Sequence, residues 1–572
     1  MSRLPSLPRG VGSDEDAARA TGRWAAIEEI AAHAYQPGQL YLGTLPYPSE
    51  EAWPELQALE TKQASLAADT SRPAALRQAD IDALQQRIEE LCESGALDIG
   101  IADDRHHLIF AGSRAGKSTT ILIPNLQRYP GAVIVTDPKG ELASKTAAHR
   151  AASIEEGGLG QNVLVMDPYN TSNVPESMRA SWNPLDLIDP EDELAVDVAA
   201  SIAEAVIIRS NEENAHFDDS ARSFIKGLTL FTADAHAGRV TRNLVTVYSY
   251  LMRGATLELA RDRGGPPQPD DPSPFDYLLR LMQRCEAFDG VVSGAAEALL
   301  SLGQRERGSV LSTARRSMEF LERRPMRRLL SHSSFDLDSL KTDPKGVSLY
   351  LCLPPQRMSD CGRFLRLMIA MTLERLYALP EAPATGHPVL AMLEEFPVLG
   401  HMPLIEQAAG YAAGFGLKLL IVCQDLTQLK RHYREGWETF LGNAGCIQAF
   451  ANADVTTLEY LSKKLGECEI TQVVRNLSSA AALSSNEPGA QSQLQSLMAA
   501  RGPAGLVTMP LSFLSDPTGS GQSLTTTESW NSQRQRTPLL LPDEIARLFA
   551  REANAQIVLI SGQRPWVLGR QQ

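Results

Sequence analysis

Short apolar runs alternate with longer amphipathic stretches over most of the chain. Each run is about as long as one strand and ends in a polar or turn residue, as buried strands of parallel sheets do. These runs lie at residues 108–110, 132–142, 163–169, 346–355, 389–393, 417–424, 446–452 and 555–562. Stretches with apolar residues at helical spacing separate most of them. The alternation predicts an α/β fold with a doubly wound, mainly parallel sheet that binds ligands at its carboxyl edge.

This alternation is interrupted between residues 190 and 341. The stretches with helical spacing there follow one another without a strand, and they are residues 193–208, 220–235, 274–285 and 309–324. A series of amphipathic helices can bury its apolar faces without a sheet. We therefore expect an all-α insertion domain within the α/β domain.

Two other regions offer no candidate chemistry. Residues 1–95 are acidic and rich in Ala, Glu and Pro, with a loop-like segment at 35–45 and a helix at 75–92, which predicts a helical N-terminal lobe. Residues 470–535 are rich in Ser, Gln, Gly, Ala and Thr, which predicts a flexible linker. The α/β domain would then consist of residues 96–189, 342–469 and 536–572.

A phosphate-binding pattern follows the first strand. Lys117-Ser118-Thr119 opens a helix after a loop of small residues, although Ala111 stands where the strict pattern has Gly. Backbone N–H groups of such a loop bind phosphate oxygens, the lysine neutralises the β- and γ-phosphates, and the serine hydroxyl binds Mg²⁺. The predicted nucleotide-binding residues are Gly112, Ser113, Arg114, Ala115, Gly116, Lys117, Ser118, Thr119 and Asp137.

Polar residues at the ends of three further strands are expected at the same edge. Asp137 and Lys139 follow one strand and would project near the nucleotide; the alternative is a loop cap beside a surface lysine. Glu394 and Glu395 follow a second strand as a Walker B pair would, with Glu394 in the Mg²⁺ shell and Glu395 orienting or deprotonating the attacking water. A carboxylate pair on a surface turn is the alternative. Gln424 ends a third strand at the position of a γ-phosphate sensor.

Bulk composition restricts the class of protein. The chain has 572 residues, enough for about two to four domains. A net charge of -15 argues against a protein coated in nucleic acid but allows a local basic channel. The seven cysteines form no CxxC pair, and several lie in apolar runs, as buried thiols of a reducing compartment do. No apolar run reaches the ~18 residues that a membrane-spanning helix needs, so we expect a soluble protein.

Basic residues are concentrated at residues 305–328, which hold eight arginines and three glutamates. At about 100° per residue, Val310, Ala314, Met318 and Leu321 share one helix face. The arginines are either a solvated surface or contacts to a phosphate backbone. The candidate DNA contacts are Arg315, Arg316 and Arg323.

Several ordered segments together resemble the type IV coupling proteins, the TraG/TraD family of conjugation and type IV secretion ATPases. They are RHHLIFAGSRAGKST, VIVTDPKGEL, SWNPLDLI (181–188), LEEFPVLGHMPLIEQA (393–408), AGFGLKLLIVCQDLTQL (413–429), NADVTTLEYLSKKLG (452–466), PLLLPDEI and GQRPW. The resemblance covers about residues 96–572 apart from the predicted linker. It implies a RecA-like P-loop motor domain interrupted by an all-α domain, assembled as a hexamer with ATP and Mg²⁺ between subunits.

The resemblance also implies residue roles. Lys117, Ser118, Glu394, Glu395 and Gln424 would form the catalytic site. Arg105 falls where members of the family carry an arginine that reaches a neighbour's nucleotide. A second such arginine of some relatives is replaced by Ala413.

Typical members begin with transmembrane helices, which this sequence lacks. We therefore expect a protein of the bacterial cytoplasm, or one held at the inner membrane by an anchored partner.

The leading hypothesis is an ATP-hydrolysing coupling protein that delivers DNA with its relaxase, or effector proteins, to a type IV secretion channel. One alternative is a recruitment platform for effector proteins with little ATP turnover. The glutamate in place of Asp at 394, Ala413 and the negative net charge favour that alternative. Another alternative is a cytoplasmic DNA-pumping ATPase unrelated to secretion.

Overall fold

The computed structural model describes residues 22–570, apart from 69–73, 93, 210–214, 235–240, 267, 269 and 484–521. They divide into two compact units, one with Arg23–Leu465 and Leu540–Gln572 and the other with Gly466–Leu539. None of the helices in the described part is long and apolar enough to span a membrane. All seven cysteines are free, and those at 352 and 423 are buried as predicted.

The larger unit is built on an 11-stranded sheet of order β2-β1-β13-β12-β9-β3-β8-β7-β4-β6-β5. The strands from β9 to β5 in this order run parallel. They are β9 (Ala444–Phe450), β3 (His106–Ala111), β8 (Leu417–Cys423), β7 (Val389–Leu393), β4 (Val133–Asp137), β6 (Val347–Cys352) and β5 (Asn162–Met166). Every residue of β3, β8 and β9 is buried, because both faces of the sheet are covered. This confirms the predicted mainly parallel sheet.

The other edge of the sheet is antiparallel and was only partly predicted. It consists of β12 (Ala555–Ile560), β13 (Trp566–Gly569), β1 (Leu40–Tyr47) and β2 (Gly95–Ile101). The loop predicted at 35–45 is wrong, because residues 40–47 form β1. Glycine and proline within this segment hid the strand, whose pairing bulges between Tyr41 and Gly43. The predicted N-terminal lobe therefore contributes β1 to the sheet and ends where β2 begins.

A helical hairpin connects β1 to β2. Its helices are α2 (Trp53–Ala68) and α3 (Ala74–Cys92), and α3 matches the helix predicted at 75–92. Buried residues from both helices form a small apolar cluster at Ala52, Leu56, Ile88 and Leu91. Gln63 donates a hydrogen bond to Gln85 across the pair at 2.7 Å. A short helix, α1 (Ile27–Ala31), precedes β1.

Outside the insertion, further helices of the larger unit connect parallel strands or, as α19 and α21 do, follow β9 and precede β12. They are α4 (Ile123–Arg128), α5 (Glu141–Ala151), α15 (Met358–Ala378), α16 (Pro403–Tyr411), α17 (Leu426–Tyr433), α18 (Trp437–Gly442), α19 (Val455–Leu465) and α21 (Pro542–Leu548). Helix α4 continues a π-helical turn, η1 (Ser118–Leu122).

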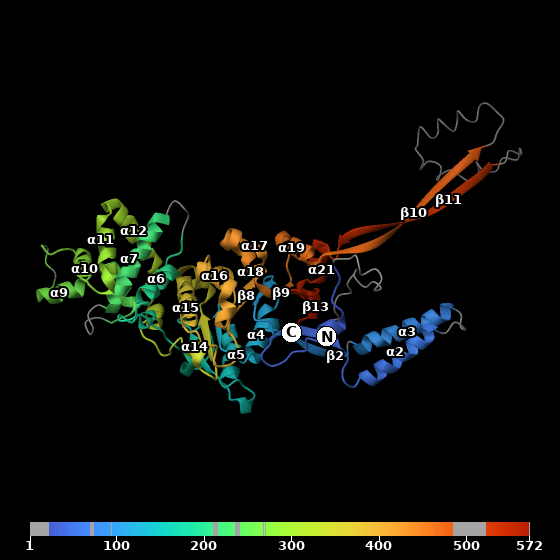
Figure 1. Ribbon diagram of the computed structural model, residues 1–572, viewed down its shortest axis with the longest axis horizontal. Coiled ribbons are helices and arrows are strands. Elements are labelled where there is room, and N and C mark those ends of the chain that lie inside the picture. The colour runs from blue at the N-terminus through green and yellow to red at the C-terminus, as the bar shows by residue number, and fades with distance from the viewer. Residues whose placement is uncertain are drawn as a thin grey trace. The chain divides into compact units, whose positions relative to one another are not determined.

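Between β5 and β6 the described residues form helices and no strand, which confirms the all-α insertion. The helices are α6 (Ala195–Val206), α7 (Ala215–Asp234), α8 (Leu244–Arg253), α9 (Thr256–Arg263), α10 (Pro274–Gln283), α11 (Val291–Ser301), α12 (Gln304–Ser317), α13 (Arg324–Leu329) and α14 (Ser339–Thr342). Figure 1 shows α6 to α12, in green, gathered in one group. The helix predicted at 309–324 ends earlier, at Ser317, and a 3₁₀ turn (Glu319–Glu322) follows before Pro325.

The smaller unit is an antiparallel ribbon. Strand β10 (Glu467–Leu483) pairs with β11 (Gln522–Pro538) in a continuous register from Glu467↔Pro538 to Leu483↔Gln522. The predicted linker is therefore wrong for residues 470–483 and 522–535, while 484–521 lie outside the described residues. The amino-acid composition did not predict these strands, because they are held by backbone hydrogen bonds between distant segments and need little apolar side-chain area.

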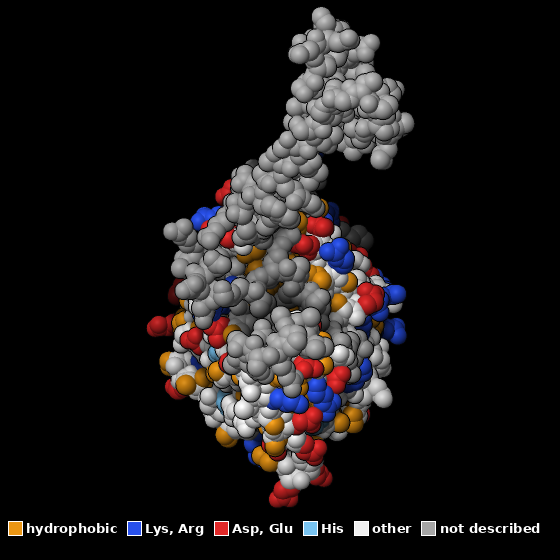
Figure 2. All heavy atoms as spheres, turned by 90° about the vertical axis from the view of Figure 1, so that its right-hand side faces the viewer, with side chains coloured by type: hydrophobic (Ala, Val, Ile, Leu, Met, Phe, Trp, Pro, Cys, Tyr) orange, Lys and Arg blue, Asp and Glu red, His pale blue; other side chains and the backbone are white. Residues whose placement is uncertain are grey.

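Acidic and basic side chains are mixed on the surface drawn in Figure 2. The acidic excess of the chain, 69 Asp and Glu against 54 Lys and Arg, is not gathered into one patch on that face.

Candidate functional site

The P-loop joins the end of β3 to η1 and depends on two glycines. A Cβ at Gly112 would lie 2.1 Å from the Ala451 backbone oxygen, so no larger residue fits there. Gly116 has φ +87°, in the region that favours glycine. Ala111, at the position where the strict pattern has Gly, is a fully buried residue of β3. Its methyl group packs in the core, so the departure from the pattern leaves the loop itself unchanged.

The structure brings the P-loop and the predicted carboxylate pair together. The Lys117 Nζ donates to Glu395 Oε1 at 2.8 Å. The Ser118 hydroxyl donates to Glu394 Oε1 at 3.0 Å. Both contacts join the start of η1 to the end of β7, two strands away in the sheet. The carboxylates therefore lie beside the P-loop, not on a separate surface turn.

Each glutamate is held in a defined orientation. Glu394 is 5% exposed, and its backbone oxygen accepts from the Thr136 hydroxyl at 2.8 Å. Glu395 has a left-handed backbone (φ 55°), a conformation that costs free energy for a residue with a side chain. Gln424 donates from Nε2 to Glu395 Oε2 at 3.3 Å, and Asn452 donates to the Gln424 backbone oxygen at 3.2 Å. The residue predicted as a sensor thus lies beside the predicted catalytic carboxylate.

Burial changes the acidity of this site. It raises the pKa of Glu394 to about 7, against the opposing effect of Lys117, and nearby Asp137 raises it further. Burial likewise raises the pKa of Asp137 to about 6, although backbone N–H groups partly offset the effect. Glu394 is therefore close to half-protonated at neutral pH.

Asp137 is positioned as a helix cap. It is fully buried, and its carboxylate accepts from the backbone N–H groups of Glu141 at 3.1 Å and Ala143 at 2.8 Å. These groups open α5 and lack partners within the helix. Lys139 is exposed beside this cap. This arrangement matches the alternative given for the pair, a loop cap beside a surface lysine.

The residues present fit a magnesium ion bound together with a nucleotide. Among the described residues, no group of three or more His, Cys, Asp or Glu side chains could hold a metal by itself. Mg²⁺ is usually held by one or two carboxylates with phosphate oxygens and water. The adjacent Ser118 hydroxyl and Glu394 carboxylate offer such a partial ligand set.

Sequence reasoning missed Arg570, which lies against the P-loop. This arginine is 6% exposed, and its Nη1 donates to the Ala115 backbone oxygen at 2.5 Å. Its Nη2 donates to the Arg551 backbone oxygen at 2.8 Å, and its guanidinium lies 4.5 Å from the centre of the Phe450 ring. Burial lowers its pKa to about 10, so it remains charged at neutral pH. An arginine after a short apolar strand gives no signal of this contact.

The two positions predicted to face a neighbouring subunit lie away from this site. Arg105 precedes β3 and so lies at the amino edge of the sheet, opposite the P-loop. Its guanidinium is paired with Asp103 at 2.5 Å. Ala413 is exposed in a 3₁₀ turn, η10 (Ala412–Phe415), just before β8. Neither residue can reach the nucleotide site of its own chain.

The predicted DNA-contact arginines do not form one group. Arg315 donates to the Leu251 backbone oxygen at 3.2 Å and packs over the Phe275 ring. Arg323 is paired with Asp360 at 3.3 Å, and Arg316 is exposed. The apolar face predicted for this segment is confirmed, since Val310, Ala314, Met318 and Leu321 are all buried. Helix α12 turns Arg315 towards α8 and α10, and contact of the three arginines with DNA stays a prediction.

Known proteins match both the sequence and the fold. The conjugal transfer protein TraG of Escherichia coli is 27% identical over 385 residues, which are 64% of this chain and 56% of that protein. VirD4 of Agrobacterium fabrum (strain C58 / ATCC 33970) is 27% identical over 368 residues, which are 63% of this chain and 49% of VirD4. The chain thus spans about half the length of the curated relatives it matches.

A solved structure of the bacterial conjugative coupling protein TrwBdeltaN70 has a TM-score of 0.53 at 16% identity. The match covers 83% of this chain and 87% of that one, which confirms the RecA-like P-loop fold. The family described as Type IV secretory system Conjugative DNA transfer matches residues 74–512. Because this match covers well over half of the sequence, the chain belongs to that family.

Proposed function

We propose that this protein is an ATP-hydrolysing coupling protein of a type IV secretion or conjugation system. The observation that carries the proposal is the pair of contacts between P-loop and carboxylates, Lys117 to Glu395 and Ser118 to Glu394. Two structures of one protein of similar fold support the choice of ligand: TrwB was solved with the ATP analogue ADPNP and with ADP and Mg²⁺. The family description, conjugative DNA transfer, supports the wider role.

The proposed chemistry assigns one task to each side chain. Residues 112–119 bind the phosphates, and Lys117 leaves Glu395 to neutralise them. Ser118 and Glu394 would hold Mg²⁺, which would neutralise charge on the phosphates. The freed Glu395 carboxylate then accepts a hydrogen bond or a proton from the attacking water. Gln424, 3.3 Å from Glu395, orients the same water.

We further propose assembly as a homo-hexamer with each nucleotide between two subunits. Arg105 supports this arrangement, since it lies at the amino edge of the sheet and cannot act on its own P-loop. In a ring it would reach the neighbour's nucleotide and stabilise charge on the transferred phosphate. The proposed partners are a secretion channel and a cargo, either DNA with its relaxase or effector protein. Exposed Arg316 is the candidate that remains for a phosphate contact from the insertion.

Steady-state ATP hydrolysis by the full-length protein tests this function. We expect ATP turnover that single- or double-stranded DNA stimulates. Rising salt concentration should weaken this stimulation, because contacts to DNA phosphates are salt-sensitive. Lys117→Ala should lower turnover by roughly 100-fold or more, because it removes the charge aimed at the phosphates. Nucleotide binding without ATP turnover would refute the proposal that the protein hydrolyses ATP. Turnover indifferent to DNA would refute DNA as cargo.

A recruitment platform for protein cargo is the second candidate function. It is favoured by the engagement of Arg315 and Arg323 within the protein, which leaves fewer arginines for a phosphate backbone. It predicts nucleotide-dependent assembly, little turnover and no response to DNA in the same assay.

A further inference from the structure

Arg366 on α15 joins two parts of the chain that the sequence separates widely. The residue is 3% exposed, and its Nε donates to the Ala205 backbone oxygen at 3.1 Å. Its Nη1 donates to the backbone oxygens of Leu399 and His401, the latter at 2.8 Å. Burial lowers the pKa of Arg366 to about 10, so the group stays cationic at neutral pH. One buried guanidinium thus binds the end of α6 and the segment after β7.

The segment after β7 leads directly from the catalytic carboxylates to Arg366. Glu395, with its left-handed backbone, precedes the 3₁₀ turn η9 (Phe396–Leu399), which ends at Gly400. Phe396 is buried and stacks on Tyr433, with ring centres 5.6 Å apart and planes 6° apart. Only residues 396–398 separate Glu395 from Leu399, whose backbone oxygen accepts from Arg366.

On its other side, Arg366 caps the first helix of the insertion. The last carbonyl groups of a helix lack partners within it and carry partial negative charge, which a cation stabilises. Ala205 and Val206 end α6, and Arg363 donates to the Val206 backbone oxygen at 2.9 Å. Arg363 therefore caps the same helix end, but among the described residues it makes no hydrogen bond to the segment after β7.

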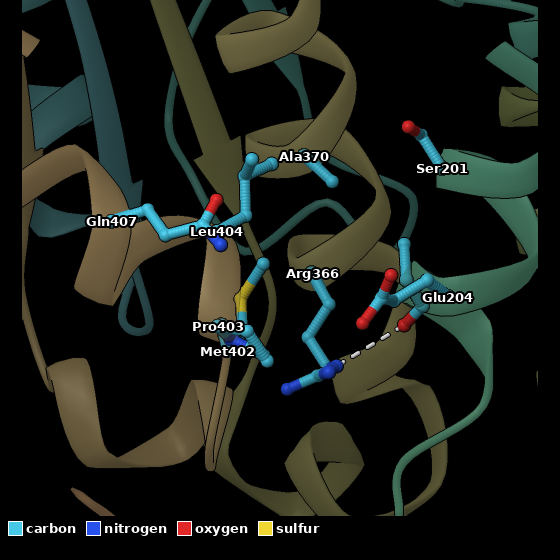
Figure 3. Close-up of a pocket in the computed structure, with 9 residues that line it drawn as sticks. Ser201, Glu204, Arg366, Ala370, Met402, Pro403, Leu404 and Gln407 are labelled. Carbon is cyan, nitrogen blue, oxygen red and sulfur yellow. Dashed lines mark hydrogen bonds between the residues drawn. The ribbon is translucent and has the colours of Figure 1, made fainter. Parts of the chain in front are cut away.

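A cavity of about 140 Å³ lies beside this contact, between α6 and the start of α16. Figure 3 shows Ser201 and Glu204 of α6 on one side, Met402 to Leu404 and Gln407 on the other, and Arg366 between them. Side chains that face each other across a cavity transmit little force by packing. The hydrogen bonds of Arg366 join the two sides of this cavity directly.

The ion pair between Lys117 and Glu395 supplies the event that this connection would transmit. Lys117 and Glu395 are ion-paired at 2.8 Å, with 11% and 29% of their side-chain surfaces exposed. A bound phosphate competes with Glu395 for Lys117, because both are anions and Lys117 carries a single charge. Nucleotide binding would therefore remove Lys117 as a partner of Glu395 and leave the hydrogen bond from Gln424.

We propose that Arg366 transmits the nucleotide state from Glu395 to the helical insertion through the end of α6. This inference rests on the proposed function, since it requires nucleotide at the P-loop. Arg366 acts as a positioning residue: it touches no reacting atom, and its bonds make the segment 395–401 and α6 move together.

Hydrogen exchange of the full-length protein, with and without Mg²⁺ and a non-hydrolysable ATP analogue, tests this proposal. In the wild type we expect nucleotide to change exchange in both 395–401 and 195–206, by about fivefold or more, the usual lower range of coupling between sites. In Arg366→Gln the change at 395–401 should persist and the change at 195–206 should vanish. Arg363→Gln, which removes a cap from the same helix end, is the matched control and should keep both responses.

A second variant covers the case in which Arg366→Gln fails to fold, as judged by its thermal unfolding. Glu395→Gln breaks the ion pair without touching α15, so α6 should exchange without nucleotide as the wild type does with it. Three results would overturn the proposal. Arg366→Gln could keep the nucleotide response of residues 195–206, or Arg363→Gln could lose it equally. Hydrogen exchange of α6 in Glu395→Gln could also remain as in the nucleotide-free wild type. If neither segment of the wild type responds to nucleotide, the proposed function fails and this inference fails with it.

Discussion

The carboxyl edge of the sheet brings together charged side chains that are far apart in the sequence, whereas the arginine-rich segment of the insertion places neighbouring charges in different environments. At the sheet edge, Lys117, Glu394, Glu395 and Gln424 come from distant segments and bond to one another or to the P-loop. In the insertion, Arg315, Arg316 and Arg323 are close in sequence yet each has a different environment. Parallel strands that end at one edge gather side chains, whereas a helix distributes neighbours around its axis.

The largest effect should come from Glu395→Gln. We expect ATP turnover to fall by about 100-fold or more, because the amide cannot accept a proton from water. Nucleotide binding should persist, since Lys117 no longer has a carboxylate competing for it. The measurement is turnover together with binding of a fluorescent ADP analogue. Glu435→Gln, at an exposed position, is the control, and equal losses in the two variants would contradict the assignment.

The acidity of Glu394 gives the second test of the sheet edge. Its pKa of about 7 means that the carboxyl is mostly protonated at pH 6 and mostly ionised at pH 8. Because Mg²⁺ binds the ionised form, Mg²⁺-dependent nucleotide affinity should rise roughly tenfold over this range. Glu394→Gln should abolish the rise. A pH-independent affinity in the wild type would exclude Glu394 from the Mg²⁺ shell.

The raised pKa of Glu394 also predicts how the free energy of unfolding changes with pH. The folded-state pKa of about 7 lies above the ordinary value of 4.5, so the folded protein binds more protons between these values. The contribution of Glu394 to the free energy of unfolding is therefore most favourable below pH 4.5 and is lost as the pH rises to about 7. Glu394→Gln should raise the unfolding temperature at pH 8 but leave it unchanged near pH 4.5.

Arg570→Ala tests whether the residue that follows β13 supports nucleotide binding at the P-loop. It removes the bonds from the guanidinium to the backbone oxygens of Ala115 and Arg551, so the P-loop loses a support. Bonds from a charged donor contribute about 1.5–3 kcal/mol, so ADP affinity should fall by about tenfold. Titration with a fluorescent ADP analogue measures it. Arg551→Ala, which keeps its backbone oxygen, should bind normally; unchanged affinity in Arg570→Ala would show that this contact does not support nucleotide binding.

The smallest effects are expected for two neighbouring arginines of α12, whose replacement should change different properties. Arg316→Ala should weaken DNA binding a few-fold and reduce the slope of log affinity against log salt by about 1. Arg315→Ala should leave DNA binding unchanged but lower the free energy of unfolding by about 1 kcal/mol, because it loses the Leu251 bond and the Phe275 contact. Equal salt slopes in both variants would mean that the insertion does not contact DNA through this helix.

The sequence predicts a feature well when the residues that indicate it are adjacent in the chain. The parallel strands and the residues that end them were predicted because an apolar run and its final polar residue are adjacent in the chain. Strand β1 was missed because its partners, residues 95–101 and 569, are distant, and its own Gly43 and Pro46 suggest a loop. The contact of Arg570 with Ala115 joins residues 455 positions apart, so only the fold reveals it.

The pairing of β1 with β2 has a practical consequence for handling this protein. The chain leaves the sheet at Tyr47 and returns at Gly95, and these two residues are register partners. The helical hairpin α2–α3 is therefore attached by both ends at a single point of the sheet. A graft could replace the whole hairpin, or a fluorescent label or surface tether could be attached to it, without altering the register between β1 and β2. That makes the hairpin a suitable attachment point for single-molecule measurements on this protein.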